Sequence, residues 1–258
     1  MDSARDARKY VSYVLSVVVF VIGIFAWQVI VDTFHIPVYL LPGPVRVFSV
    51  MVSTSIAWPS AILATLYETL AGFALSVVVG LVLAIVIAEF ATLRNIVYPY
   101  ILVAQIIPKV AIAPILVIWL GFGLESKVLL AFLVSFFPIV IDASSGLLLV
   151  DDDLSLLFRA LGANKRKYLL KLQLPNSVPY LFNGMKVAIS LAVIGAVVAE
   201  FISAKNGLGF LILEAQMVTN TTLAFASIVY LSVLGIVLFL AVIGFEALVH
   251  RWKPGVKG

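Results

Sequence analysis

Long apolar runs recur along the chain, and they constrain its fold more than any other feature. A helix needs roughly 20 predominantly apolar residues to cross the hydrocarbon core of a bilayer. Runs of about that length or longer occupy residues 11–31, 61–88, 96–120, 128–150, 178–203 and 223–249. Only 12% of the residues are charged, about half the fraction of an average soluble protein, while 63% are apolar. The sequence therefore predicts an all-α, polytopic membrane protein with six transmembrane helices.

The first run is predicted to remain in the protein as a span. A cleaved signal peptide has an apolar stretch of about 7 to 15 residues before a small-residue cleavage site. Residues 11–31 exceed that length, and residues 27–32 offer no such site. After this run the chain is rich in proline, and Pro44 is placed to begin a short interfacial helix over residues 45–52.

The third run contains three prolines, Pro99, Pro108 and Pro114, which must kink or break its helix. A tight turn is expected directly after it, over residues 121–127. Later in the chain, a glycine-rich loop precedes an apolar segment at residues 211–217 that is too short to cross a membrane.

Lysine and arginine predict which side of the membrane each loop occupies, because cytoplasmic loops carry an excess of both. With six spans, both termini and the loop over residues 151–175 share one side, which holds twelve basic residues against three on the other. The twelve are Arg5, Arg8, Lys9, Arg94, Arg159, Lys165, Arg166, Lys167, Lys171, Arg251, Lys253 and Lys257, and the three are Arg46, Lys127 and Lys205. We therefore expect both termini in the cytoplasm. The net charge of +4 has the same origin and does not indicate nucleic-acid binding.

The loop over residues 151–175 is the longest polar interruption between apolar runs, and its pattern predicts two short helices. Four apolar residues share one face of the first helix: Leu154, Leu157, Phe158 and Leu161. Gly162 follows, where a helix can end in the left-handed conformation. Asn164 is placed to cap a second, basic helix, which Pro175 is expected to end. The apolar face needs a lipid surface or a partner protein to cover it.

This loop resembles a known motif. Gly162, nine residues and then Leu172-Gln173-Leu174-Pro175 are similar to the cytoplasmic "EAA" loop of permease subunits in ATP-binding-cassette (ABC) importers. The pattern in that family is Glu-Ala-Ala, three residues, Gly, nine residues, Ile, one residue and Leu-Pro, between the third-last and second-last spans. The sequence departs from the pattern at its start, where Leu156-Leu157-Phe158 stand in place of Glu-Ala-Ala.

Further motifs resemble the nitrate/sulfonate/taurine-type subgroup of these permeases and follow in its order from about residue 40 to residue 250. They are Leu41-Pro42-Gly43-Pro44, Pro108 to Pro114 with Trp119-Leu120-Gly121-Phe122-Gly123 and Ser126-Lys127, Phe136-Phe137-Pro138, Arg159 to Ala163, Ala199-Glu200-Phe201, and Gly207-Leu208-Gly209.

The resemblance implies the type I importer fold, with residues 1–258 as a single transmembrane permease domain in a bacterial inner membrane. It implies a homodimer, two separate ATPase subunits that bind the ATP and magnesium, and an extracytoplasmic binding protein that delivers the solute. The cargo would be a sulfonate, nitrate, bicarbonate or similar anion, or a pyrimidine-like nutrient. Coupling helices over residues 152–174 would contact the ATPase through Leu154, Leu157, Phe158, Arg159, Ala160, Leu161, Gly162, Ala163, Leu174 and Pro175. The chain itself has no G-x-x-x-x-G-K-[ST] phosphate loop and is expected to need no cofactor.

Ionisable residues inside spans are functional candidates because each costs roughly 2.5–3.5 kcal/mol to insert. Lys109, Asp142 and Glu200 are candidates for the translocation path or a gate. Lys109 either pairs with Asp142 or attracts an anion, and if it pairs, solute selection falls to the binding protein. Three other ionisable residues are expected to reach the membrane surface. Lys186 would extend to the cytoplasmic interface, Glu246 would face that interface, and Glu68 would contact solvent near the outer face.

Other functional classes fit the sequence less well. A secondary carrier or channel that acts without an ATPase often shows two similar halves, but the proline-rich third run has no counterpart in the second half. A membrane enzyme would need a cluster of histidine, cysteine or carboxylate groups. The sequence has no cysteine and two distant histidines, which also disfavours a metal centre.

Overall fold

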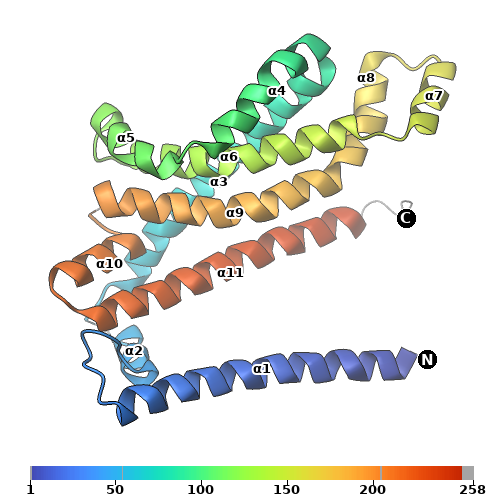
Figure 1. Ribbon diagram of the computed structural model, residues 1–258. Helices are drawn as coiled ribbons and strands as arrows, with labels where there is room; N and C mark the ends of the chain where they lie inside the picture. The colour runs from blue at the N-terminus through green and yellow to red at the C-terminus, as the bar shows by residue number, and fades with distance from the viewer. Residues whose placement is uncertain (1, 54, 204, 252–258) are drawn as a thin grey trace. The chain divides into compact units, whose positions relative to one another are not determined.

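The computed structural model describes residues 2–53, 55–203 and 205–251, and all regular secondary structure within these ranges is helical (Figure 1). The chain divides into two compact units. One comprises Met1–Ala57 with Leu211–Val229, and the other comprises Trp58–Phe210 with Tyr230–Gly258. The larger unit contains the loop singled out by the sequence. The prediction of one permease domain over residues 1–258 stays a prediction.

Three long helices form the centre of the larger unit: α3 (Trp58–Glu89), α6 (Leu124–Leu148) and α9 (Leu174–Ser203). Helix α6 lies between the other two, and small residues let the backbones approach closely. A Cβ added at Gly72 of α3 would lie 2.5 Å from the Cβ of Ala131, and one added at Gly195 of α9 would lie 2.8 Å from the Cα of the same alanine. A hydrogen bond of 2.6 Å between Ser76 and Ser135 also joins α3 to α6.

Glycines of the long helices fall into two groups by their surroundings. Added Cβ atoms at Gly72, Gly80, Gly184 and Gly195 would all meet α6 closely. At Gly235 and Gly244 of α11 (Thr221–Arg251), by contrast, an added Cβ meets no described atom within 4 Å.

The third apolar run is broken, as its prolines predicted. Helix α4 (Ala91–Ile106) is followed by the 3-10 segment η1 (Lys109–Ile112) and α5 (Ala113–Leu120), with an 82° bend at the break. Pro108 lies at that break, and Pro114 lies in the first turn of α5, where a missing N–H leaves no intrahelical bond unmade. Within the described ranges, five helices are long and apolar enough to cross a membrane, or six if the bent pair forms one span. The predicted all-α fold is confirmed, and the predicted six spans match the higher of these two counts.

Two predicted boundaries were wrong. The turn after α5 is confined to residues 121–123, where Gly121 has φ 79°, and α6 begins at Leu124 rather than after Lys127. Pro175 does not end the second loop helix. Helix α8 (Lys165–Tyr168) runs through a π-helical segment, η2 (Leu169–Gln173), into α9. Because a π-helical turn shifts the carbonyl that a proline ring would otherwise meet four residues back, the helix continues past Pro175.

The smaller unit contains α1 (Asp2–Thr33), the short α2 (Pro44–Met51) and parts of α10 (Leu208–Met217) and α11. Helix α2 begins at Pro44 as predicted, and α10 is too short to span a membrane. The Trp27 and Phe225 rings lie 5.8 Å apart, and Thr221 donates a 2.6 Å hydrogen bond to the Tyr39 carbonyl. The basic tail continues to Lys253 and Lys257, which lie outside the described residues.

Candidate functional site

The loop between α6 and α9 carries α7 (Asp152–Ala160) and α8, and it projects from one end of the larger unit (Figure 1). Asp151 caps the start of α7, where its Oδ1 accepts hydrogen bonds of 2.9 Å from the Asp153 N–H and 3.2 Å from the Leu154 N–H. Asp152 and Asp153 in the first turn and Arg159 in the last complement the helix dipole. The sequence thus specifies where this helix begins.

The end of α7 is equally well defined. Gly162 adopts φ 66°, the left-handed conformation that its sequence position predicted. Its N–H donates to the Arg159 carbonyl, and the Ala163 N–H donates to the Phe158 carbonyl, both at 3.0 Å. These two bonds form a Schellman motif, which satisfies carbonyls that the helix end leaves free. Ala160 is the last helical residue and is exposed.

Helix α8 braces α7 from the side. The Asn164 side chain accepts a 2.9 Å hydrogen bond from the Lys167 N–H, which confirms the predicted cap. Tyr168 makes an edge-on contact with Phe158 at 6.3 Å between ring centroids, and its hydroxyl lies 2.9 Å from the Ser155 hydroxyl. The loop is therefore a packed helical pair with its own internal contacts.

Three leucines form an exposed stripe along α7, which we call the leucine stripe. Leu154, Leu157 and Leu161 expose 45%, 51% and 74% of their surface. Phe158 was predicted to belong to this face, but it is half-buried against Tyr168 and so supports the loop from within. Leu156 is 62% exposed and points away from the stripe, because each residue turns the helix by about 100°.

The base of the loop is tied to the end of α6 by two side chains that the sequence reasoning missed. Gln173 donates a 3.0 Å hydrogen bond to the Leu147 carbonyl, and Asn176 donates to the Gly146 and Leu149 carbonyls at 2.9 and 2.8 Å. These bonds satisfy carbonyls that the end of α6 leaves without helical partners. In the sequence, these two amide side chains directly flank Leu174 and Pro175, and that position could have suggested a capping role. Leu174 and Pro175 are themselves half-buried at the start of α9.

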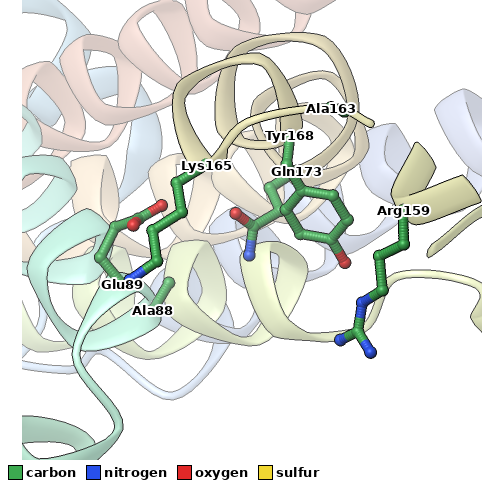
Figure 2. A pocket seen from close by; sticks show the side chains of 7 residues that line it. All are labelled: Ala88, Glu89, Arg159, Ala163, Lys165, Tyr168 and Gln173. Atoms are coloured by element: carbon green, nitrogen blue, oxygen red, sulfur yellow. The ribbon is translucent and has the colours of Figure 1, made fainter. Parts of the chain in front are cut away.

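A cavity of about 320 Å³ lies between the loop and the end of α3. Ala88 and Glu89 of α3 line one side, and the loop supplies Arg159, Ala163, Lys165, Tyr168 and Gln173. In Figure 2 the Lys165 side chain extends toward Glu89, and Arg159 of α7 lies on the other side of Tyr168. The loop thus presents both an apolar stripe and a charged recess.

The structure does not bring Lys109 and Asp142 together. The Lys109 Nζ donates a 2.7 Å hydrogen bond to the Gln105 carbonyl and lies 4.4 Å from the centre of the Phe137 ring. Across the described ranges, no carboxylate lies within 4.0 Å of this Nζ. Asp142 is half-buried beside Gly184 instead. The pairing considered from the sequence is therefore wrong.

Glu200 is fully buried and holds the start of α10 in place. Its carboxyl group accepts hydrogen bonds of 2.6 Å from the Thr65 hydroxyl and 2.5 Å from the Gly209 N–H. The Thr65 hydroxyl in turn accepts a 2.9 Å bond from the Leu208 N–H. A carboxylate is favourable at a helix N-terminus because of the helix dipole. The proposed gate role of Glu200 stays a prediction, and its observed contacts are structural.

The sequence reasoning misplaced Glu68 and missed the partners of Lys186 and Glu246. Glu68, expected to contact solvent, is only 2% exposed and pairs with Lys127 at 2.5 Å. Lys186 and Glu246, both expected at the interface, bind each other at 2.6 Å and join α9 to α11. Each charge has a partner far along the chain, which no local pattern reveals.

A family of known proteins matches residues 76–253, more than half of the chain, and is described as the binding-protein-dependent transport system inner membrane component. The chain belongs to this family. It is therefore a multi-pass membrane permease, and its relatives are permease subunits of ABC importers for small solutes rather than enzymes.

Individual relatives include the formylaminopyrimidine transport permease ThiX of Halalkalibacterium halodurans, which is 35% identical over 217 residues, 83% of this chain and 86% of that one. The riboflavin permease RibX of Chloroflexus aurantiacus is 34% identical over 230 residues, 88% and 85% of the two chains. The taurine permease TauC of Escherichia coli K12 is 30% identical over 238 residues, 88% and 84% of the two chains. The predicted likeness to the nitrate/sulfonate/taurine-type subgroup is confirmed.

A solved structure of the MetNI methionine ABC transporter in an inward-facing conformation shares the permease's fold, with a TM-score of 0.67 at 20% sequence identity. The match covers 77% of this chain and 99% of the other. The predicted importer fold is thereby confirmed, and the function as an ABC importer permease is shown by the sequence relatives.

Proposed function

We propose that the permease couples to a separate ATPase through the α7–α8 loop, with the leucine stripe as the docking surface. The observation that carries this proposal is the exposure of Leu154, Leu157 and Leu161 on a helix that is capped at both ends and braced by Tyr168. A helix held this rigidly loses little conformational entropy when it binds. Its apolar face suits a helix-in-groove contact with a partner protein.

The residues around the stripe suit a protein partner. Asp151, Asp152 and Asp153 begin the helix beside Leu154 and Arg159 lies in its last turn, so charges of both signs flank the stripe. The nearby recess offers Glu89, Arg159 and Lys165, which provide polar contacts at the rim of a docking site. An apolar centre with a charged rim is the usual anatomy of a protein–protein interface.

The other subunits of the transporter are proposed from the family, and the membrane orientation is proposed from the positive-inside rule. The assembly contains two copies of this permease, two ATPase subunits that bind ATP and magnesium, and an extracytoplasmic binding protein. Both termini and the α7–α8 loop lie in the cytoplasm of a bacterial cell, with the spans in its inner membrane. Relatives named for formylaminopyrimidine, riboflavin and taurine support a small polar solute, either a pyrimidine-like heterocycle or a small anion.

The docking proposal is tested by replacing Leu157 with aspartate and measuring how much ATPase co-purifies with the permease. Burying a leucine contributes roughly 1.5–3 kcal/mol, so the change is expected to weaken binding by about 10- to 100-fold. Leu156→Asp is the matched control, because it adds the same charge to an exposed leucine of α7 outside the stripe. Normal ATPase recovery with Leu157→Asp, or equal losses in both variants, would refute the stripe as the docking surface.

The dimer is tested separately by measuring the mass of the purified complex in detergent with the ATPase bound. Two copies of this chain are expected in each complex. One copy beside a different permease subunit would contradict homodimerisation and leave the family assignment intact.

A further inference from the structure

The Lys109 ammonium group lies at the break between α4 and α5, and none of the described residues provides it with a counter-ion. It donates one hydrogen bond, to the Gln105 carbonyl, and lies over the face of Phe137. An ammonium group has three N–H donors, so two remain for other partners. Within the described part of the chain, no carboxylate approaches its Nζ within 4.0 Å.

The surroundings of Lys109 hold the charge in place rather than neutralise it. The Phe137 ring attracts a cation through its negative face, which offsets part of the cost of desolvation. The Gln105 carbonyl belongs to the last turn of α4, where carbonyls lack helical partners and attract positive charge. Both contacts stabilise the ammonium group, but neither contributes a full negative charge that would neutralise it.

A cavity of about 250 Å³ opens beside this group, and its lining includes Gln105, Lys109, Phe137 and Pro138. Ligand pockets usually have volumes of about 300–1,000 Å³, so this space suits a small solute or one end of a larger one. It lies at the 82° break between two apolar helices that form a broken span or a re-entrant loop, and irregular backbone at membrane depth is tolerated where it lines a cavity. Ionisable groups in such positions mark solute or ion pathways.

We propose that Lys109 is an anion-attracting station in the translocation path, which contacts a negatively charged oxygen group of the solute as it passes α4 and α5. The inference rests on the proposed function, because Lys109 can contact a passing solute only if this chain forms part of a solute path. Phe137 supports one side of the ammonium, and the solute contacts the N–H groups that remain. The permease then contributes to solute selection, because Asp142 does not neutralise this charge.

The absence of cysteine in the sequence allows a direct test. A single cysteine is placed at Gln105 or Val110, and the assembled complex in membranes is treated with anionic and cationic methanethiosulfonate reagents of similar size. A unit charge acting across roughly 6 Å of water on reagents of opposite sign changes the ratio of their rates about tenfold. We expect the anionic reagent to be favoured by about that factor with Lys109 present, and the preference to disappear with Lys109→Gln.

Lys109→Arg keeps the charge and is expected to keep the preference. A cysteine at Leu156, on the α7–α8 loop, serves as the distant control, because its rate ratio is expected to be independent of Lys109. A ratio unchanged by Lys109→Gln would overturn the proposal. Unreactive cysteines at both Gln105 and Val110 would also overturn it, since the cavity would then be closed to water.

This outcome is separable from the docking experiment. If Leu157→Asp leaves the ATPase bound while the rate ratio still depends on Lys109, the docking surface is refuted and the charged station stands. If Leu157→Asp loses the ATPase while the ratio of the two reagent rates does not depend on Lys109, the docking surface is supported and the role of Lys109 is refuted.

Discussion

Two lysine–glutamate pairs join helices within the larger unit, and their different burial predicts different costs of breaking them. Lys127 and Glu68 lie 2.5 Å apart with side chains 12% and 2% exposed. Lys186 and Glu246 lie 2.6 Å apart with side chains 25% and 18% exposed. Because the chemistry and the distances are nearly the same, the comparison isolates the effect of burial.

Replacing Lys127 with methionine leaves the Glu68 carboxylate buried without its counter-ion. Its Oε2 already accepts no hydrogen bond from the described residues, and Glu200 lies beside it. Removing one partner of a buried pair costs about 3–5 kcal/mol. Glu68→Met should cost less, because the flexible stem of Lys127 can carry the ammonium toward the surface. Replacing both residues removes both charges, so the double variant should be more stable than Lys127→Met alone.

Breaking the Lys186–Glu246 pair should cost roughly 1 kcal/mol, the upper end of the range for exposed pairs. Both side chains are partly exposed, so neither charge is left fully buried when its partner is removed. The assay is a double-mutant cycle for each pair, with methionine replacements and unfolding of the purified permease followed in mixed micelles. A coupling energy in the buried pair at least twice that of the other is expected. Equal coupling energies, or a cost below about 1 kcal/mol for Lys127→Met, would refute the argument from burial.

Two further predictions concern glycine conformation and helix capping. Gly207 has φ 131° and its added Cβ would collide with the Glu200 carboxyl, so Gly207→Ala should destabilise the start of α10 by about 1–3 kcal/mol, seen as faster hydrogen exchange at the Gly209 N–H. Gly235→Ala is the control and should be neutral or stabilising by up to about 1 kcal/mol, because its Cβ enters open space in a helix. Asp151→Ala removes the cap of α7 and should weaken ATPase binding by about 1 kcal/mol, measured by titration of the purified subunits, with membrane insertion unchanged. Unchanged ATPase affinity in that variant would contradict a coupling role for the capped helix.

Features set by local sequence were predictable. The break near Pro108 follows from the geometry of the proline ring, and the end of α7 follows from the ability of Gly162 to adopt a positive φ. The Asn164 cap follows from a short side chain that can reach a free N–H two or three residues ahead. Each of these depends on residues within one helical turn. The six apolar runs were predictable for a similar reason, since a membrane span is defined by its own length and composition.

Features set by tertiary contacts were not predictable from one sequence. Phe158 has helical spacing with the leucine stripe, yet it packs inward because Tyr168 on the next helix offers an aromatic edge. Glu68 and Lys127 are separated by 59 positions, so only the packing of α3 against α6 reveals that they meet. Pro175 carries a strong stop signal, and the π-helical turn before it overrides that signal.

Helix α9 is held by hydrogen bonds near both of its ends, and this arrangement indicates how a movement of the loop would be transmitted. At one end, Gln173 and Asn176 bind the last carbonyls of α6, so α7 and α8 cannot shift without pulling on both long helices. At the other end, Glu200 holds the start of α10 through the Gly209 N–H. Between them, Gly184 and Gly195 seat α9 closely against α6, which leaves little room for the helices to slide. A force applied to the leucine stripe is therefore expected to displace α6 and α9 together.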